Sequence, residues 1–220
     1  MIIDPTEQSF KENHKIMIGS IVPRPIAFVS TKSSDGILNL APFSYFNGVC
    51  SNPPTIMFAP SRRGYDGLIK DTLNNIQNTK EFVINLVSEE IADQMVACST
   101  DYDNEVDEFE VSGLTPIDCV KVNPPRVKES KISFECELNT IVEIGKAEAG
   151  AGFIVIGTII MFHIDDTVYK DGHIDLNTLN PLGRLAGNAY TRIVKTFDIC
   201  LLYTSPSPRD LSTSRMPSSA

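Results

Sequence analysis

Cationic and hydroxyl side chains are concentrated in a short stretch of the chain, just before a segment with helical periodicity. The run Ser61-Arg62-Arg63-Gly64 is followed by Lys70 and Thr72. Guanidinium, ammonium and hydroxyl donors near the amides of a helix start suit a phosphate group. A solvated basic loop is the alternative interpretation, and for the two arginines alone it is the better one.

A second group of residues suggests a site for a planar ring. In the segment 39–44, Asn39 precedes a strand-like run in which Pro42 cannot donate to a β-ladder, so we expect an edge, a bulge or a ligand-facing position. Small side chains at Ala41 and Ser44 would let a flat ring approach the backbone. An edge strand kinked for barrel closure explains the same residues equally well.

Arg24 is flanked by Pro23 and Pro25, which restrain its backbone to extended geometry. A guanidinium held in this way could pin an anion or form an ion pair with a carboxylate. On residue type alone, the structural ion pair is the favoured interpretation.

Motifs of several common enzyme classes are missing from the sequence. There is no GxGxxG, no GxxxxGK[ST], no GxSxG and no HExxH, so Rossmann, P-loop, serine hydrolase and zincin sites are not supported. The three histidines are far apart, and the five cysteines have no CxxC spacing. We therefore predict reduced, mostly buried thiols, no metal site and no protein nucleophile.

The composition indicates one compact domain. The chain has 220 residues, of which 42% are apolar, and a formal net charge of −9. This acidity argues against nucleic-acid binding, which requires a basic surface. No apolar stretch approaches about 20 residues and the N-terminus is polar, so we expect no signal peptide, no membrane span and a cytoplasmic protein.

The last 21 residues, 200–220, differ from the rest. They are rich in Ser and Pro, and they match a translated transposase-type sequencing adapter in three blocks, CLLYTS, PSPRD and SRMPSSA. We interpret 200–220 as a non-native, disordered tail and 1–199 as the domain.

Hydrophobic periodicity predicts an antiparallel barrel with helical excursions, because the expected helices do not alternate with the strands. One helix should present Tyr65, Leu68, Ile69, Leu73 and Ile76 on one face, and a second should span 89–98. We expect 131–144 and 153–164 to form a long hairpin. The other expected strands are 26–31, 37–46, 55–59 and 81–87.

The chain resembles the flavin reductase-like, FMN-binding split-barrel family, in particular its flavoredoxin-like branch. Each matching block is short, but their order along residues 23–190 is specific. The blocks are PRPIAFVST, DGILNLAPFSYF, NPP, KDTLNNI, EFVINLV, DEFEVSGLT, FECEL and PLGRLAGNAY. The last block reads RLAG where family members usually read RLGG, which puts the backbone around Ala186 in question.

The resemblance implies a six-stranded antiparallel split barrel, a homodimer, and one FMN per subunit near the subunit interface. By position, it implies that the isoalloxazine edge is lined by Asn39, Ala41, Pro42 and Ser44. The residues implied to hold the ribityl phosphate are Ser61, Arg62, Lys70 and Thr72, supported by Asn75. Arg24 and the segment 184–190 would close the rim of the pocket.

The implied activity is reduction of flavin by NADH or NADPH, with hydride transfer directly to flavin N5, so no catalytic side chain is expected. Electrons would pass to a monooxygenase, a redox partner protein or a small acceptor. The alternative is a flavoredoxin-type electron carrier that is reduced by a partner protein. A barrel that has lost flavin is a third possibility, against which the intact segments 39–44 and 70–75 argue.

Overall fold

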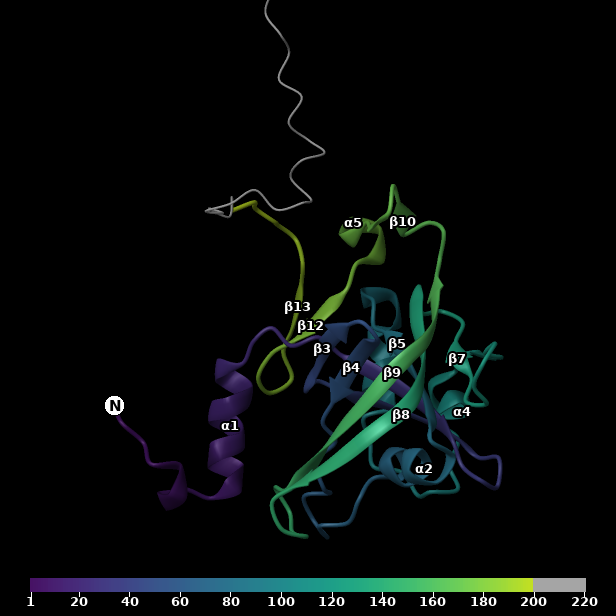
Figure 1. Ribbon diagram of the computed structural model, residues 1–220. Coiled ribbons are helices and arrows are strands. Elements are labelled where there is room, and N and C mark those ends of the chain that lie inside the picture. Colours follow the sequence, from purple (N-terminus) through teal and green to yellow (C-terminus); the bar gives the residue numbers. More distant parts are fainter. Residues whose placement is uncertain (200–220) are drawn as a thin grey trace, which may run out of the picture.

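The computed structural model describes residues 1–199, so the predicted tail lies outside the described residues. A seven-stranded antiparallel sheet, in the order β2-β1-β5-β8-β9-β4-β3, curls into a barrel (Figure 1). Its strands are β1 (Ala27–Lys32), β2 (Leu38–Phe43), β3 (Phe46–Ser51), β4 (Pro54–Phe58), β5 (Glu81–Leu86), β8 (Ile132–Ile144) and β9 (Gly152–Ile164).

The β8–β9 hairpin is the longest element of the barrel, with 13 residues in each strand. The two strands pair from Ile132 opposite Ile164 to Ile144 opposite Gly152, with two register shifts on the way. In Figure 1 the hairpin crosses the whole molecule, and its tip lies near the start of α1 (Phe10–Ser20). The predicted hairpin is confirmed.

Three phenylalanine rings form the centre of the barrel core. Phe58 lies between Phe43 and Phe82, with ring centroids 5.1 Å and 5.7 Å away. All three side chains are buried among branched aliphatic residues from β1, β5 and β9. Tilted and edge-on pairs of this kind add to the free energy gained from burying the rings themselves.

The helices differ in how much they bury. The barrel is covered by α2 (Asp71–Thr79), which buries Leu73 and Ile76, and by α3 (Ala92–Ala97) and α4 (Glu108–Ser112). In contrast, no residue of α1 is fully buried, and this helix stands beside the barrel (Figure 1). A capping box between Ser9 and Glu12 stabilises its first turn.

Short elements complete the described chain. They are η1 (Pro5–Glu7), η2 (Glu89–Ile91), β6 (Pro116–Ile117), β7 (Arg126–Val127), β10 (Tyr169–Lys170), β11 (His173–Ile174), α5 (Leu176–Leu179), β12 (Leu182–Arg184) and β13 (Tyr190–Arg192). No helix among residues 1–199 is long and apolar enough to cross a membrane.

The split-barrel fold agrees with the prediction, and two local details differ. The expected strand 37–46 is interrupted at Ser44 and Tyr45, so that it supplies both β2 and the start of β3 and raises the strand count to seven. The helix expected from Tyr65 begins only at Asp71, because the chain turns at Gly67 with φ +73°. Tyr65 and Leu68 are consequently exposed.

Gly157 on β9 gives a direct test of the core packing. A Cβ atom at this position would lie 2.3 Å from Cζ of the buried Phe82 ring. We expect Gly157→Ala to lower the free energy of unfolding by about 1–3 kcal/mol, the usual cost of overpacking a core. Urea denaturation measures this change.

Gly48 on the exposed strand β3 is the matched control, because nothing lies within 4 Å of the added Cβ. Gly48→Ala should leave stability unchanged or raise it by about 0.5–1 kcal/mol, since alanine loses less backbone entropy than glycine. Equal effects of the two substitutions would contradict the packing described for Phe82.

Candidate functional site

Five of the residues predicted for a ligand site line one narrow cleft, between β2 and the start of α2. They are Asn39, Ala41, Pro42, Lys70 and Thr72. The space inside the cleft is about 60 Å³, well below the roughly 300–1,000 Å³ of ordinary small-molecule sites, so it can hold only part of a ligand. Its other walls are formed by Phe43, Arg63, Asp71, Cys98, Ser99, Thr100, Asp101, Tyr102 and Glu108.

A buried hydrogen-bond network forms the floor of this cleft. The amide oxygen of Asn39 accepts bonds from the hydroxyls of Thr72 at 2.8 Å and Thr31 at 3.2 Å. The Thr31 hydroxyl in turn accepts a bond from the amide of Asn75 at 3.0 Å. Asn75 and Thr72, both on α2, are thereby tied to β1 and β2.

Glu108, the first residue of α4, completes the network from the other side. Its carboxylate accepts bonds from Asn39 Nδ2 at 2.8 Å and from the Leu40 backbone N–H at 3.1 Å. Burial raises the pKa of Glu108 above its usual range, although these two hydrogen bonds oppose the shift. The sequence analysis does not single out Glu108, because nothing in the local sequence shows that this carboxylate is buried.

Cations and carboxylates alternate at the mouth of the narrow cleft. Arg63 pairs with Asp71 at 2.9 Å, and Lys70 pairs with Asp101 at 2.6 Å. Lys70 is also the N-cap residue of α2, and no side chain caps this helix start. The first amides of α2 and the two cations are therefore placed to receive an anion that displaces a carboxylate.

Ser61 and Arg62 line a second, wider cleft of about 460 Å³, open to solvent, between α1 and the barrel. The Arg62 guanidinium lies 5.0 Å from the Phe153 ring centroid. It donates to the Gly67 carbonyl at 3.0 Å and to Glu143 at 2.6 Å. Phe10, Asn13, His14, Met17, Tyr45, Gly64 and Gly150 form the remaining wall.

The structure thus distributes the predicted phosphate ligands between two clefts that share one loop. Residues 61–64 contribute Arg63 to the narrow cleft and Ser61, Arg62 and Gly64 to the wide one. The segment that ends β2 is shared in the same way, with Pro42 in the narrow cleft and Tyr45 in the wide one.

Arg24 is buried, with 4% of its surface exposed, and its donors are directed at protein groups. One terminal nitrogen donates to the carbonyls of Ile18 at 2.8 Å and Ile21 at 2.6 Å, and the other to that of Leu185 at 3.0 Å. Its Nε lies 3.3 Å from the Ser44 hydroxyl. Arg24 therefore joins the end of α1 to the segment that follows β12. It also contacts Ser44, which lies two residues after Pro42.

Comparison with known proteins identifies the family. The flavin reductase like domain family matches residues 18–180, which contain β1 to β9 and every residue of the narrow cleft. The chain belongs to this family. The resemblance found in the sequence is confirmed.

Solved structures of the flavin reductase-like fold agree closely. Nitrilotriacetate monooxygenase component B from Bacillus cereus is 36% identical, with a TM-score of 0.86 over 90% of this chain and 98% of that one. 2-Nitrobenzoate 2-nitroreductase NbaA of Pseudomonas fluorescens is 29% identical, with a TM-score of 0.82 over 94% and 100%. Flavoredoxin of Desulfovibrio vulgaris (Miyazaki F), 24% identical, shares the fold with a TM-score of 0.68 over 81% and 91%.

The raised pKa of Glu108 makes the stability of this flavin reductase-like domain depend on pH. The folded protein binds the Glu108 proton more tightly than the unfolded chain does. The contribution of Glu108 to stability is therefore fully present below about pH 4.3, the pKa of its carboxyl in the unfolded chain. It is lost as the pH rises through the higher pKa that this carboxyl has in the folded protein. The glutamine side chain cannot ionise. The free energy of unfolding of Glu108→Gln should therefore fall less than that of wild type as the pH rises from about 4 to 7.

Glu110 on the same helix is exposed, so Glu110→Gln is the matched control. Its unfolding free energy should follow the wild-type pH profile. Urea denaturation at several pH values gives the free energy of unfolding of each variant. The slope of this free energy against pH distinguishes the variants. Parallel profiles for wild type and Glu108→Gln would contradict the assigned shift.

Proposed function

We propose that this chain binds FMN and functions as an NAD(P)H-dependent flavin reductase. The observation that carries the proposal is the gathering of Arg62, Arg63 and Lys70 around the loop 61–64 and the uncapped start of α2. A phosphate needs such a set of charge-assisted donors, and Ser61 and Thr72 add hydroxyls.

Donors without partners support the fit of FMN to this loop. Within residues 1–199, the buried Nε atoms of Arg62 and Arg63 have no hydrogen-bond partner, and neither does the Tyr45 hydroxyl. All three line the two clefts described above. Leaving a buried donor unsatisfied costs about 1–3 kcal/mol, which a bound phosphate or flavin carbonyl would recover.

The segment 41–45 is the proposed wall for the isoalloxazine ring. Ala41 and Pro42 have little side-chain bulk, and Pro42 has no N–H to satisfy. Ser44 is held by Arg24, and Asn39 is held by the network that includes Asn75. We therefore assign Arg24 and Asn75 a positioning role, and we assign ring contact to Asn39, Ala41, Pro42 and Ser44.

When bound, FMN supplies the redox chemistry by accepting hydride from NADH or NADPH at N5 and passing the electrons onward. The residues of the chain bind and orient the flavin. No side chain is required to move a proton in hydride transfer. We propose a cytoplasmic homodimer that serves a monooxygenase, a redox partner protein or a small acceptor. The names of two similar structures, a monooxygenase component and a nitroreductase, support an oxidoreductase.

Anaerobic reduction tests the activity. The full chain is loaded with FMN, and the flavin absorbance is followed after NADH or NADPH is added. We expect at least one nicotinamide to bleach it. Bound flavin that neither nicotinamide bleaches would favour the flavoredoxin-type carrier, and no flavin binding would refute both functions.

Substitutions at the loop test the phosphate position. Arg62→Ala and Lys70→Ala should each weaken FMN binding about 10- to 100-fold, the loss expected for one charge-assisted hydrogen bond. Asp101→Asn should strengthen binding, because it removes the carboxylate that pairs with Lys70. Flavin fluorescence quenching measures the dissociation constants.

Arg192→Ala and Lys128→Ala are the matched controls, since both side chains are exposed and line neither cleft. Their FMN affinity should equal that of wild type. Unchanged affinity in both Arg62→Ala and Lys70→Ala would show that the phosphate is bound elsewhere.

A further inference from the structure

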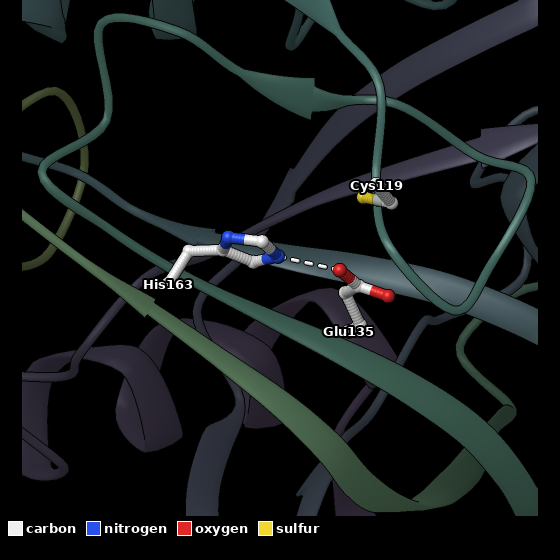
Figure 2. A group of neighbouring side chains, drawn as sticks. All are labelled: Cys119, Glu135 and His163. Carbon is white, nitrogen blue, oxygen red and sulfur yellow. Dashed lines mark hydrogen bonds and ion pairs between the residues drawn. The ribbon is translucent and has the colours of Figure 1, made fainter.

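Three side chains with metal-binding atoms converge on the outer side of the β8–β9 hairpin (Figure 2). Cys119 comes from the loop between β6 and β7, Glu135 from β8, and His163 from β9. The Cys119 sulfur, a Glu135 carboxylate oxygen and a His163 ring nitrogen all lie within 4.8 Å of one another. The residues line neither cleft, so they belong to a different part of the molecule.

Strand register places two of these residues side by side. Ser133 pairs with His163, and Glu135 pairs with Met161, so Glu135 and His163 are diagonal neighbours on one face of the hairpin. Nε2 of His163 lies 2.5 Å from Oε1 of Glu135, the contact drawn as a dashed line in Figure 2.

The same carboxylate holds the loop that carries Cys119. Glu135 accepts backbone N–H bonds from Val120 at 2.8 Å, Lys121 at 2.6 Å and Val122 at 3.2 Å. Burial opposes ionisation of Glu135, but these bonds and His163 outweigh it and hold its pKa below the usual range. The carboxylate is therefore fixed in position next to the thiol.

The cluster is reachable from solvent although its centre is buried. The Glu135 side chain is fully buried, whereas 18% of the His163 side chain is exposed and Cys119 is partly exposed. Burial and the nearby Glu135 charge raise the pKa of Cys119 to about 12, and Arg126 opposes the shift. A coordinating metal ion removes the proton of a ligating thiol.

We propose that Cys119, Glu135 and His163 bind a divalent transition-metal ion, with Zn²⁺ as the best match. A thiolate, a carboxylate and a neutral imidazole carry a charge of −2, which Zn²⁺ neutralises, and binding releases the thiol proton to solvent. Thiolate and imidazole select zinc over the hard cations Mg²⁺ and Ca²⁺. Three protein ligands leave one tetrahedral position for water.

The required rearrangement is on the order of 1 Å: the Cys119 sulfur, within 4.8 Å of the other ligand atoms, must approach them, and His163 and Glu135 must separate. Ligand atoms about 2.0–2.2 Å from a tetrahedral zinc lie roughly 3.3 Å apart, so the contact between His163 and Glu135 must open by less than about 1 Å. The three backbone N–H bonds keep the carboxylate in place while the His163 ring turns. Such hydrogen bonds to a metal-binding carboxylate fix its orientation.

Metal binding at this position would add a cross-link between the loop 118–125 and the β8–β9 hairpin, which the N–H bonds to Glu135 already connect. That loop connects two strands of only two residues each, β6 and β7, so few strand-pairing bonds hold it. The bound ion therefore stabilises the loop and raises the melting temperature by mass action.

Cobalt serves as the probe, because it reports thiolate coordination through a charge-transfer band in the near ultraviolet. The full chain is freed of metal with a chelator and titrated with Co²⁺ and then with Zn²⁺ as competitor. We expect a band that saturates at one Co²⁺ per chain and is abolished by Zn²⁺. Cys119→Ser should remove the band, and His163→Gln should weaken metal binding by more than about 100-fold.

Cys50→Ser and His173→Gln are matched controls, since both residues are exposed and lie outside the cluster. They should retain the band and the wild-type affinity. As a second measurement, Zn²⁺ should raise the melting temperature of wild type and leave that of Cys119→Ser unchanged. Absence of the band in wild type, or equal zinc affinity in wild type, Cys119→Ser and His163→Gln, would overturn the proposal.

Discussion

The buried hydrogen bonds around Asn39 are the constraint on which the shape of the narrow cleft depends. They join side chains from β1, β2, α2 and α4 in a region without bulk water, where an unpaired polar group is costly. Moving α2 away from the sheet would break the bonds of Thr72 and Asn75 together. The wall that carries Lys70 is therefore held by polar contacts beneath it as well as by the apolar contacts of Leu73 and Ile76.

Arg24 has a comparable role at the opposite end of β2. Its guanidinium joins the carbonyls at the end of α1 to that of Leu185, which lies 161 residues from Arg24 in the sequence, and it also reaches Ser44. A planar fork of donors suits such a junction, whereas the single ammonium of lysine would satisfy fewer acceptors. The segment 41–45 is thus anchored at one end by Asn39 and at the other by Arg24, which leaves its backbone little freedom.

The sequence predicts the fold well where periodicity reflects burial, as in β5 and the β8–β9 hairpin. It fails where a backbone turn overrides an apolar pattern, as at Gly67, which delays the start of α2. The separation of Ser61 and Arg62 from Lys70 and Thr72 depends on side-chain directions that no spacing reveals. Cys119, Glu135 and His163 escape prediction because strand register, and no local motif, brings them together.

The loop 61–64 is a wall common to both clefts, and this has a thermodynamic consequence. A ligand that shifts the loop from one side changes the free energy of binding on the other side. Linkage requires the change to be equal in both directions. The two clefts would therefore be coupled through this loop to the extent that a ligand moves it.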